Sequence, residues 1–223
     1  METPTLDEIC KGFEQSYTPA ITDILDFEFD LHNQWLGGEI RPLVPEMHVA
    51  GPAFTVRWVN DRTPATEKQR TIVADMIDHF YPLALPIIDT SKNMNCGYWG
   101  ELVCNICKEK GIHGTVIDGG VRDPYYIWRF GFNMFAAFAC PNEADTRSRL
   151  ESFQEPIAIN NVAVRPGDFV VGDFGGVVVV PQELVPDVYR KVQALTTKES
   201  RFREIISKGI TGEGAVRTFG RSL

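Results

Sequence analysis

The sequence contains no long apolar run and fewer cations than anions. None of its hydrophobic stretches reaches the roughly 18 residues that a membrane-spanning helix needs. The first residues, Met-Glu-Thr-Pro-Thr-Leu-Asp-Glu, lack the basic-then-apolar order of a signal peptide. The 22 lysines and arginines are outnumbered by 30 aspartates and glutamates, which gives a net charge of -8. This charge argues against nucleic acid or an anionic membrane as a partner, and we expect a cytoplasmic protein.

Cysteine is scarce, and the spacings that mark common enzyme sites are missing. The five cysteines are odd in number, which suits free thiols in a reducing compartment. Cys104-x-x-Cys107 has the spacing of half a zinc site, but no second pair follows at ligand spacing, and we expect packed or partly exposed thiols. No two of the four histidines have i, i+4 spacing, and no Gly-x-Ser-x-Gly elbow is present. Gly119-Gly120 lacks the spacing of a dinucleotide-binding loop.

What the chain does contain is the composition of one ordinary globular domain. Of its 223 residues 43% are hydrophobic and 23% charged, and a chain of this length buries roughly 70% of its unfolded surface. Helical and strand patterns alternate up to about residue 140, and strand pairs follow, which predicts an α/β fold with an antiparallel part. We expect helices over about 16–29, 72–80, 102–107 and 182–208, a short helix that opens at Pro124, and strands over 49–59, 85–88, 113–118, 134–139, 157–164, 169–172 and 177–180.

The most informative stretch is Gly114-Thr-Val-Ile-Asp-Gly-Gly-Val-Arg-Asp123. We interpret it as an apolar strand that stops in a glycine turn at Gly119-Gly120 and leads into an adjacent cation and anion. Arg122 beside a carboxylate can bind a substrate carboxylate or enolate, while Asp123 holds a hard cation through oxygen. The alternative is a plain helix N-cap, because Asp before Pro124 is typical of one.

A second stretch, Gly100-Glu-Leu-Val103, has the pattern of a helix start. Gly100 leaves the backbone N–H groups of Glu101, Leu102 and Val103 uncovered, which makes this end of the helix a site for a carboxylate. The alternative is that Glu101 is there only because the helix dipole favours an acid in the first turn.

Four segments together resemble a known family. They are Trp99-Gly-Glu-Leu-Val103, Gly114 to Asp123, Val164-Arg-Pro-Gly-Asp-Phe-Val-Val-Gly-Asp173 and Val177-Val-Val-Val-Pro181. The chain resembles the 4-hydroxy-4-methyl-2-oxoglutarate/4-carboxy-4-hydroxy-2-oxoadipate aldolases, a family that also contains the regulator of ribonuclease activity A. The most specific element is an acid followed by twenty residues and then Arg-Asp, which Glu101, Arg122 and Asp123 satisfy.

The resemblance implies one domain over residues 1–223 with a β/β/α swivelling-domain fold, mixed sheets and helices at both termini. Residues 182–223 would form a C-terminal helical segment that packs on a neighbouring subunit of a homotrimer or hexamer with intersubunit active sites. The implied activity is that of a class II lyase using Mg²⁺ or Mn²⁺, an aldolase that releases pyruvate from 4-hydroxy-2-oxo-dicarboxylates and also decarboxylates oxaloacetate. The alternative is a non-catalytic, ribonuclease-regulator-like binding protein. That branch lacks the acid after the arginine, whereas Asp123 is present here.

The resemblance also implies a role for each acid of the site. Asp123 would bind the metal, and Glu101 would order a metal-bound water. A glutamate from the neighbouring subunit would lie near the metal; Glu199 is the candidate, with Glu204 as the alternative.

The substrate would be held by groups on both stretches. Arg122 would contact the keto or enolate oxygen of the 2-oxo acid. The helix start at Gly100, through the amides of Leu102 and Val103, would hold the pyruvyl carboxylate. We expect the part of the substrate beyond its pyruvyl half to contact the loops at 60–70 and 89–99 and a neighbouring chain.

Overall fold

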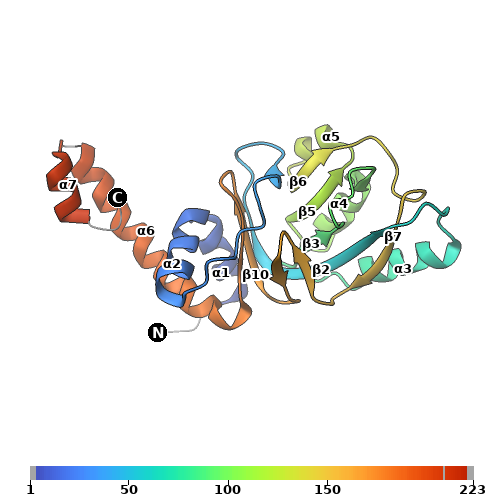
Figure 1. The fold of residues 1–223 in the computed structure, drawn as a ribbon, viewed down its shortest axis with the longest axis horizontal. Coiled ribbons are helices and arrows are strands. Elements are labelled where there is room, and N and C mark those ends of the chain that lie inside the picture. The colour runs from blue at the N-terminus through green and yellow to red at the C-terminus, as the bar shows by residue number, and fades with distance from the viewer. Residues whose placement is uncertain (1–3, 208, 220–223) are drawn as a thin grey trace.

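A nine-stranded mixed sheet forms the centre of the molecule (Figure 1). A computed structural model describes residues 4–207 and 209–219. The main path of the sheet runs β1-β6-β5-β3-β2-β10-β11, with β4 paired to β5 and β7 paired to β2. Its two ends, β1 and β11, lie in contact, so the sheet is nearly closed. The predicted α/β class, with mixed sheets and helices at both termini, is therefore confirmed.

The strands of the sheet and of a separate hairpin follow in chain order. They are β1 (Arg41–Pro42), β2 (Val49–Asn60), β3 (Leu85–Asp89), β4 (Gly97–Trp99), β5 (Gly114–Val121), β6 (Asn133–Ala139), β7 (Ser148–Phe153), β8 (Ile157–Ile159), β9 (Val162–Val164), β10 (Phe169–Asp173) and β11 (Gly176–Val180). The helices are α1 (Leu6–Glu14), α2 (Thr18–Phe29), α3 (Glu67–Asp78), α4 (Glu101–Glu109), α5 (Pro124–Arg129), η1 (Gln182–Leu184), α6 (Val185–Ser207) and α7 (Gly212–Phe219). Among the described residues no helix is both long and apolar enough to cross a membrane.

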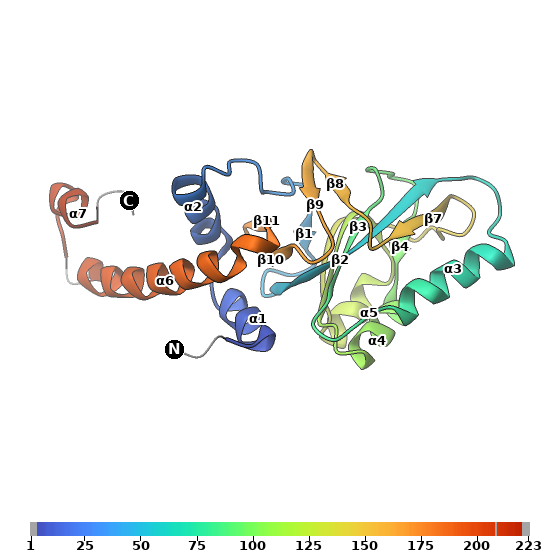
Figure 2. The same ribbon diagram turned by 90° about the horizontal axis from the view of Figure 1, so that it is seen from below.

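Parallel pairing places β2, β3, β5 and β6 side by side. Every residue of β3 and β5 is buried, as expected for central parallel strands covered on both faces. Helices α3, α4 and α5 lie at one end of the molecule, and α1, α2 and α6 at the other (Figure 2). Strand β4 leads directly into α4, and β5 leads into α5. The carboxyl ends of both strands therefore lie at the starts of these helices.

The predicted glycine turn at Gly119-Gly120 is wrong, because β5 continues through both glycines to Val121. A Cβ on Gly119 would lie 2.6 Å from Oγ1 of Thr90, and one on Gly120 would lie 2.5 Å from the carbonyl oxygen of Cys96. The glycines are needed for close approach of the loop before β4, not for a change of direction.

The predicted single strand over 157–164 is also wrong. The segment is the hairpin β8–β9, which turns at Asn160 and Asn161 with φ of 51° and 64°. Both asparagines take the left-handed conformation that a two-residue hairpin turn requires. Strands β1, β4 and β7 and helices α1 and α7 were not predicted.

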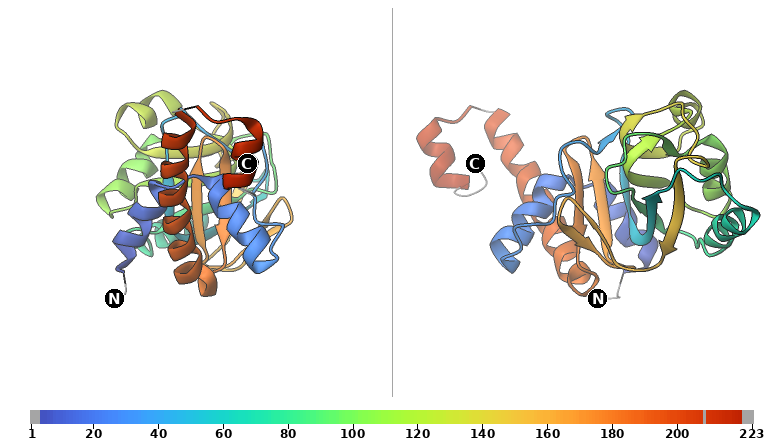
Figure 3. Two further views of the ribbon diagram at one scale, coloured as in Figure 1. Left: turned by 90° about the vertical axis from the view of Figure 1, so that its left-hand side faces the viewer. Right: turned by 45° about the vertical axis from the view of Figure 1, so that its right-hand side comes forward.

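The C-terminal helix begins with the short η1 turn, and Pro186 does not break it. Pro186 sits in the first turn of α6, where a missing N–H costs no hydrogen bond. The first half of α6 packs through Val188 and Val192 between α1 and α2, over β10 and β11 (Figure 3, left). Its second half and α7 extend away from the sheet (Figure 1), with Ile205 and Ile206 exposed. The expected packing of residues 182–223 on a neighbouring subunit stays a prediction.

Candidate functional site

A cavity of about 380 Å³ opens where β4 and β5 meet the starts of α4 and α5. Helix α3 and strand β7 close its other sides. Its walls come from β2, the 60–70 loop, α3, β4, α4, the end of β5, the loop after β6, and β7. The polar residues in these walls are Gln69, Arg70, Arg122, Asp123, Glu143, Asp145, Ser148 and Arg149.

Arg122 is held in place by β4. Its backbone N–H donates to the carbonyl oxygen of Trp99 at 2.8 Å. Gly97 leaves room for its side chain, because a Cβ on Gly97 would lie 2.4 Å from Cγ of Arg122. The guanidinium forms an ion pair with Glu143, and the Arg122 side chain keeps 33% of its surface exposed. The Arg122 guanidinium is thus carried on a backbone that cannot shift without breaking the β4–β5 pairing.

Glu143 was not predicted from the sequence. It lies in the loop after β6 and reaches the site because its backbone forms a parallel bridge with Gly97. No spacing rule connects a glutamate in this loop with an arginine at the end of β5. Only the pairing of β4 with both segments brings them together.

Asp123 occupies the N-cap position of α5, but its side chain caps nothing there. Its φ of 54° is left-handed, a conformation that costs a non-glycine residue roughly 1–2 kcal/mol. Oδ2 instead accepts a hydrogen bond of 3.4 Å from the backbone N–H of Glu101, at the start of α4. Asp123 therefore has the N-cap position that the alternative interpretation predicts, but its carboxylate points to α4 and not to α5. A residue serving only as a cap would have its side chain bonded within α5.

Gly100 is the N-cap of α4 and has no side chain to cap it; the side-chain oxygen that lies at this helix start is Oδ2 of Asp123, 3.4 Å from the backbone nitrogen of Glu101. A Cβ on Gly100 would lie 3.0 Å from Oδ2 of Asp123, so glycine allows the carboxylate to lie over the helix start. Leu102 and Val103 line the cavity, and Leu102 is 74% exposed. The backbone N–H groups at a helix start beside a cavity favour a bound anion.

Glu101 points along its own helix. Its Oε1 accepts a 2.5 Å hydrogen bond from Nδ2 of Asn105, which also donates to the Glu101 carbonyl oxygen at 3.1 Å. Glu101 is not among the residues that line the cavity. Its role in ordering a water stays a prediction, and Asn105 is a neighbour that was not predicted from the sequence.

The donor set fits a hard divalent cation with few protein ligands. No group of three or more His, Cys, Asp or Glu among the described residues could hold a metal. Asp123 supplies one carboxylate, and Mg²⁺ is commonly held by one or two carboxylates, several waters and substrate oxygens.

The side chain of Glu199 lies outside the described residues, and Glu204 is exposed on α6. Helix α6 lies at the opposite end of the molecule from α3 and α4 (Figure 1). Glu204 is therefore not part of the cavity wall of its own chain.

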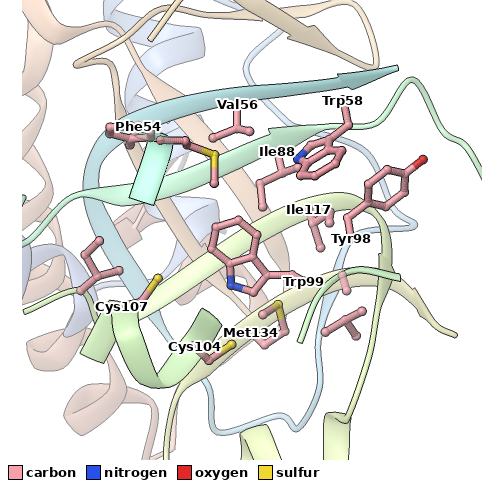
Figure 4. Packing of buried hydrophobic residues seen from close by; sticks show 14 of the residues in the cluster. Phe54, Val56, Trp58, Ile88, Tyr98, Trp99, Cys104, Cys107, Ile117 and Met134 are labelled. Carbon is pink, nitrogen blue, oxygen red and sulfur yellow. The ribbon is translucent and has the colours of Figure 1, made fainter. Parts of the chain in front are cut away.

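Cys104, Cys107 and Asp118 lie in the packed interior of the protein. Cys104 and Cys107 are fully buried in the core cluster with Trp99 and Met134 (Figure 4), which confirms packed thiols. Burial raises the pKa of Cys107 to about 12 and that of Cys104 further. Asp118 is buried and accepts from the backbone N–H and Oγ1 of Thr90 at 2.6 and 2.7 Å.

Comparison with known proteins gives relatives over most of the chain. Protein DlpA of Legionella pneumophila is 30% identical over 176 residues, which are 79% of this chain and 28% of DlpA. A protein of Halalkalibacterium halodurans with the provisional name 4-hydroxy-4-methyl-2-oxoglutarate aldolase is 28% identical over 86% of each chain.

The fold is shared with a solved structure. Streptomyces coelicolor RraAS2, described as an unusual member of the RNase ES inhibitor RraA protein family, has a TM-score of 0.78 at 22% identity. The match covers 91% of this chain and 98% of RraAS2. The RraA-like family, described as Aldolase/RraA, matches residues 18–179, which include Gly100, Arg122 and Asp123. The chain therefore belongs to the RraA-like, Aldolase/RraA family.

Proposed function

We propose that the chain is a divalent-metal-dependent lyase that releases pyruvate from 4-hydroxy-2-oxo-dicarboxylates and decarboxylates oxaloacetate. One observation carries the proposal. A fixed cation, Arg122, and a carboxylate that does not cap its own helix, Asp123, lie beside the start of α4 on one cavity wall. The provisional aldolase name of the Halalkalibacterium halodurans relative supports the same reaction class.

The three groups serve the two charges of the reacting half of such a substrate, its carboxylate and the oxygen that becomes an enolate. The N–H groups of Leu102 and Val103 would bind the 2-oxo acid's carboxylate at the helix start. Arg122 would stand against the keto oxygen, where negative charge develops as the carbon-carbon bond breaks. A fixed donor at such a position is commonly worth about 3 kcal/mol of transition-state stabilisation. Asp123 would hold Mg²⁺ or Mn²⁺, which when bound supplies Lewis-acid stabilisation of the same charge.

The cleavage balances without any further reagent. The bond between C3 and C4 breaks, its electron pair moves to the pyruvyl half as an enolate, and the C4 hydroxyl becomes a carbonyl as it loses a proton. The enolate carbon then takes up a proton. A water near Arg122, ordered by Glu101, would accept the proton of the C4 hydroxyl and return a proton to the enolate carbon. Oxaloacetate loses CO₂ through the same enolate, and one site serves both reactions.

We infer that the active unit is an oligomer, a homotrimer or hexamer. Glu199 and Glu204 lie on α6, at the opposite end of the molecule from the cavity, so either could reach a cavity only in a neighbouring copy. The outer half of α6, with Ile205 and Ile206 exposed, supplies apolar surface for that contact. Light scattering should give a mass several times 25.0 kDa, and Ile206→Glu should lower it.

The direct test is oxaloacetate decarboxylation coupled to lactate dehydrogenase, with Mg²⁺ or Mn²⁺. Asp123→Asn keeps the size of the side chain and tolerates the left-handed backbone, and it should lose at least 100-fold in rate above the metal-only background. Glu109→Ala, at an exposed acid on the far end of α4, is the matched control and should retain the wild-type rate. Equal rates in wild type and Asp123→Asn would reject the proposal. Metal-independent capture of a ribonuclease, with no turnover, would favour the regulator-like alternative.

A further inference from the structure

The cavity beside Arg122 and Asp123 has a second, apolar half. Its walls are core side chains from four elements, and Figure 4 shows two of them, Trp58 and Tyr98, on the same face of the sheet. The apolar half is lined by Trp58 on β2, Val73, Met76 and Ile77 on α3, Tyr98 on β4 and Leu150 on β7.

These side chains belong to the packed core rather than to the surface. Met76 is 1% exposed, and Trp58, Tyr98 and Leu150 are between 6% and 7% exposed. Protein interiors are normally filled to the density of organic crystals, with few voids larger than a water. A hollow of about 380 Å³ bordered by such residues is therefore a preformed site for an apolar group.

The pyruvyl half of a substrate fills only part of this space. Taking the liquid volume of one water, about 30 Å³, for each heavy atom, the six heavy atoms of pyruvate occupy about 180 Å³. That leaves about half of the 380 Å³. The remaining volume suits a ring or branched alkyl group of about six carbons.

The cations near the apolar half are already paired. Nη1 of Arg149 donates to Asp61 at 2.6 Å, and Nε of Arg70 lies 3.4 Å from Asp145. The six side chains of the apolar half carry no charge, so this half suits an apolar group and not a carboxylate. The second carboxylate of a dicarboxylate substrate would therefore lie outside the apolar half.

We propose that this half of the cavity binds an apolar substituent, larger than methyl, carried on C4 of the 4-hydroxy-2-oxo acid. The inference rests on the proposed lyase function and names the part of the substrate that the Arg122–Asp123 site does not contact. Aldol adducts of pyruvate with 2-oxo acids that carry an aromatic or branched aliphatic side chain form the substrate class.

The test compares cleavage of 4-benzyl-4-hydroxy-2-oxoglutarate with that of 4-hydroxy-4-methyl-2-oxoglutarate by the 223-residue chain with Mg²⁺. Wild type should prefer the benzyl substrate at least 10-fold in kcat/KM. Val73→Trp, which fills the apolar half, should lower that ratio at least 10-fold, and the smaller Val73→Leu should lower it less. Ala74→Trp, at the next and exposed position of α3, is the matched control and should leave the ratio unchanged.

Two kinds of failure are distinguishable. A wild type that prefers the methyl dicarboxylate, or a ratio unmoved in both Val73 variants, would overturn the apolar subsite while leaving the lyase function intact. Absence of Mg²⁺-dependent cleavage of both substrates and of oxaloacetate would reject the lyase function itself, and the subsite with it.

Discussion

Gly97→Ala is the change that tests most closely how the fold positions Arg122. The new Cβ would lie 2.4 Å from Cγ of Arg122, where ordinary contacts are 3.4–4 Å, and 3.1 Å from both the Arg122 nitrogen and the Cys140 carbonyl oxygen. Two of these three neighbours are backbone atoms, so the strain falls on the arginine side chain, which must retreat by about 1 Å. Misplacement of a reacting group by 1 Å can cost about 100-fold in rate.

The same overlap has a stability cost that can be measured separately. Overpacking by one methyl group typically costs about 1–3 kcal/mol. At about 2–4 °C for each kcal/mol in a chain of this size, Tm should fall by about 2–12 °C while the protein stays folded at assay temperature. The control is Gly38→Ala, where the new Cβ would meet nothing nearer than 3.5 Å.

The assay is oxaloacetate decarboxylation with Mg²⁺ at a temperature below both unfolding transitions. We expect kcat to fall at least 30-fold in Gly97→Ala and by less than 2-fold in Gly38→Ala. A folded Gly97→Ala protein with wild-type kcat would refute the reasoning, because it would show that displacing Arg122 has no effect on the reaction.

Three further predictions concern stability and thiol chemistry. Gly120→Ala should lose about 1–3 kcal/mol of unfolding free energy in urea, because its Cβ would lie 2.5 Å from the backbone oxygen of Cys96; an unchanged midpoint would show that β4 can shift freely. Burial raises the pKa of Asp118, so the folded state holds its proton more tightly than the unfolded state, and this group's contribution to stability falls as pH rises above about 4. Asp118→Asn should therefore gain stability relative to wild type between pH 4 and pH 6 in urea titrations, and an equal difference at both pH values would contradict the burial argument. Iodoacetamide should label only Cys140 in the native protein, since the other four cysteines are buried, and mass spectrometry showing a second fast site would contradict that packing.

The fold could be predicted where the pattern was strong. Buried runs such as Leu85–Asp89 and the helical spacing of Thr18–Phe29 gave the correct elements. Strand β7 was missed because its exposed positions, Arg149 and Glu151, leave little apolar signal. The failures at Gly119-Gly120 and at residues 157–164 have one physical cause. Glycine and asparagine mark either a turn or a close approach, and only the neighbouring segments decide which.

The candidate site divides in the same way. Arg122 and Asp123 are adjacent in one short motif, and the start of α4 forms the other. The pairing of β4 with β5 brings the two motifs together in space. Asn105 lies at i+4 from Glu101 on one helix, a spacing that could have suggested their hydrogen bond. Glu143 could not be predicted as a partner of Arg122, because the contact depends on a strand bridge. The apolar half of the cavity is likewise absent from any motif, since its walls come from four separate elements.

Mg²⁺-dependent exchange of the pyruvate methyl protons with D₂O, followed by proton NMR, tests the central claim most directly, because it reports enolate formation at the Arg122–Asp123 site alone. Wild type should exchange the protons with Mg²⁺ and stop when EDTA is added, and Asp123→Asn should exchange them at least 100-fold more slowly. No exchange in wild type, or exchange undiminished in Asp123→Asn, would contradict the account.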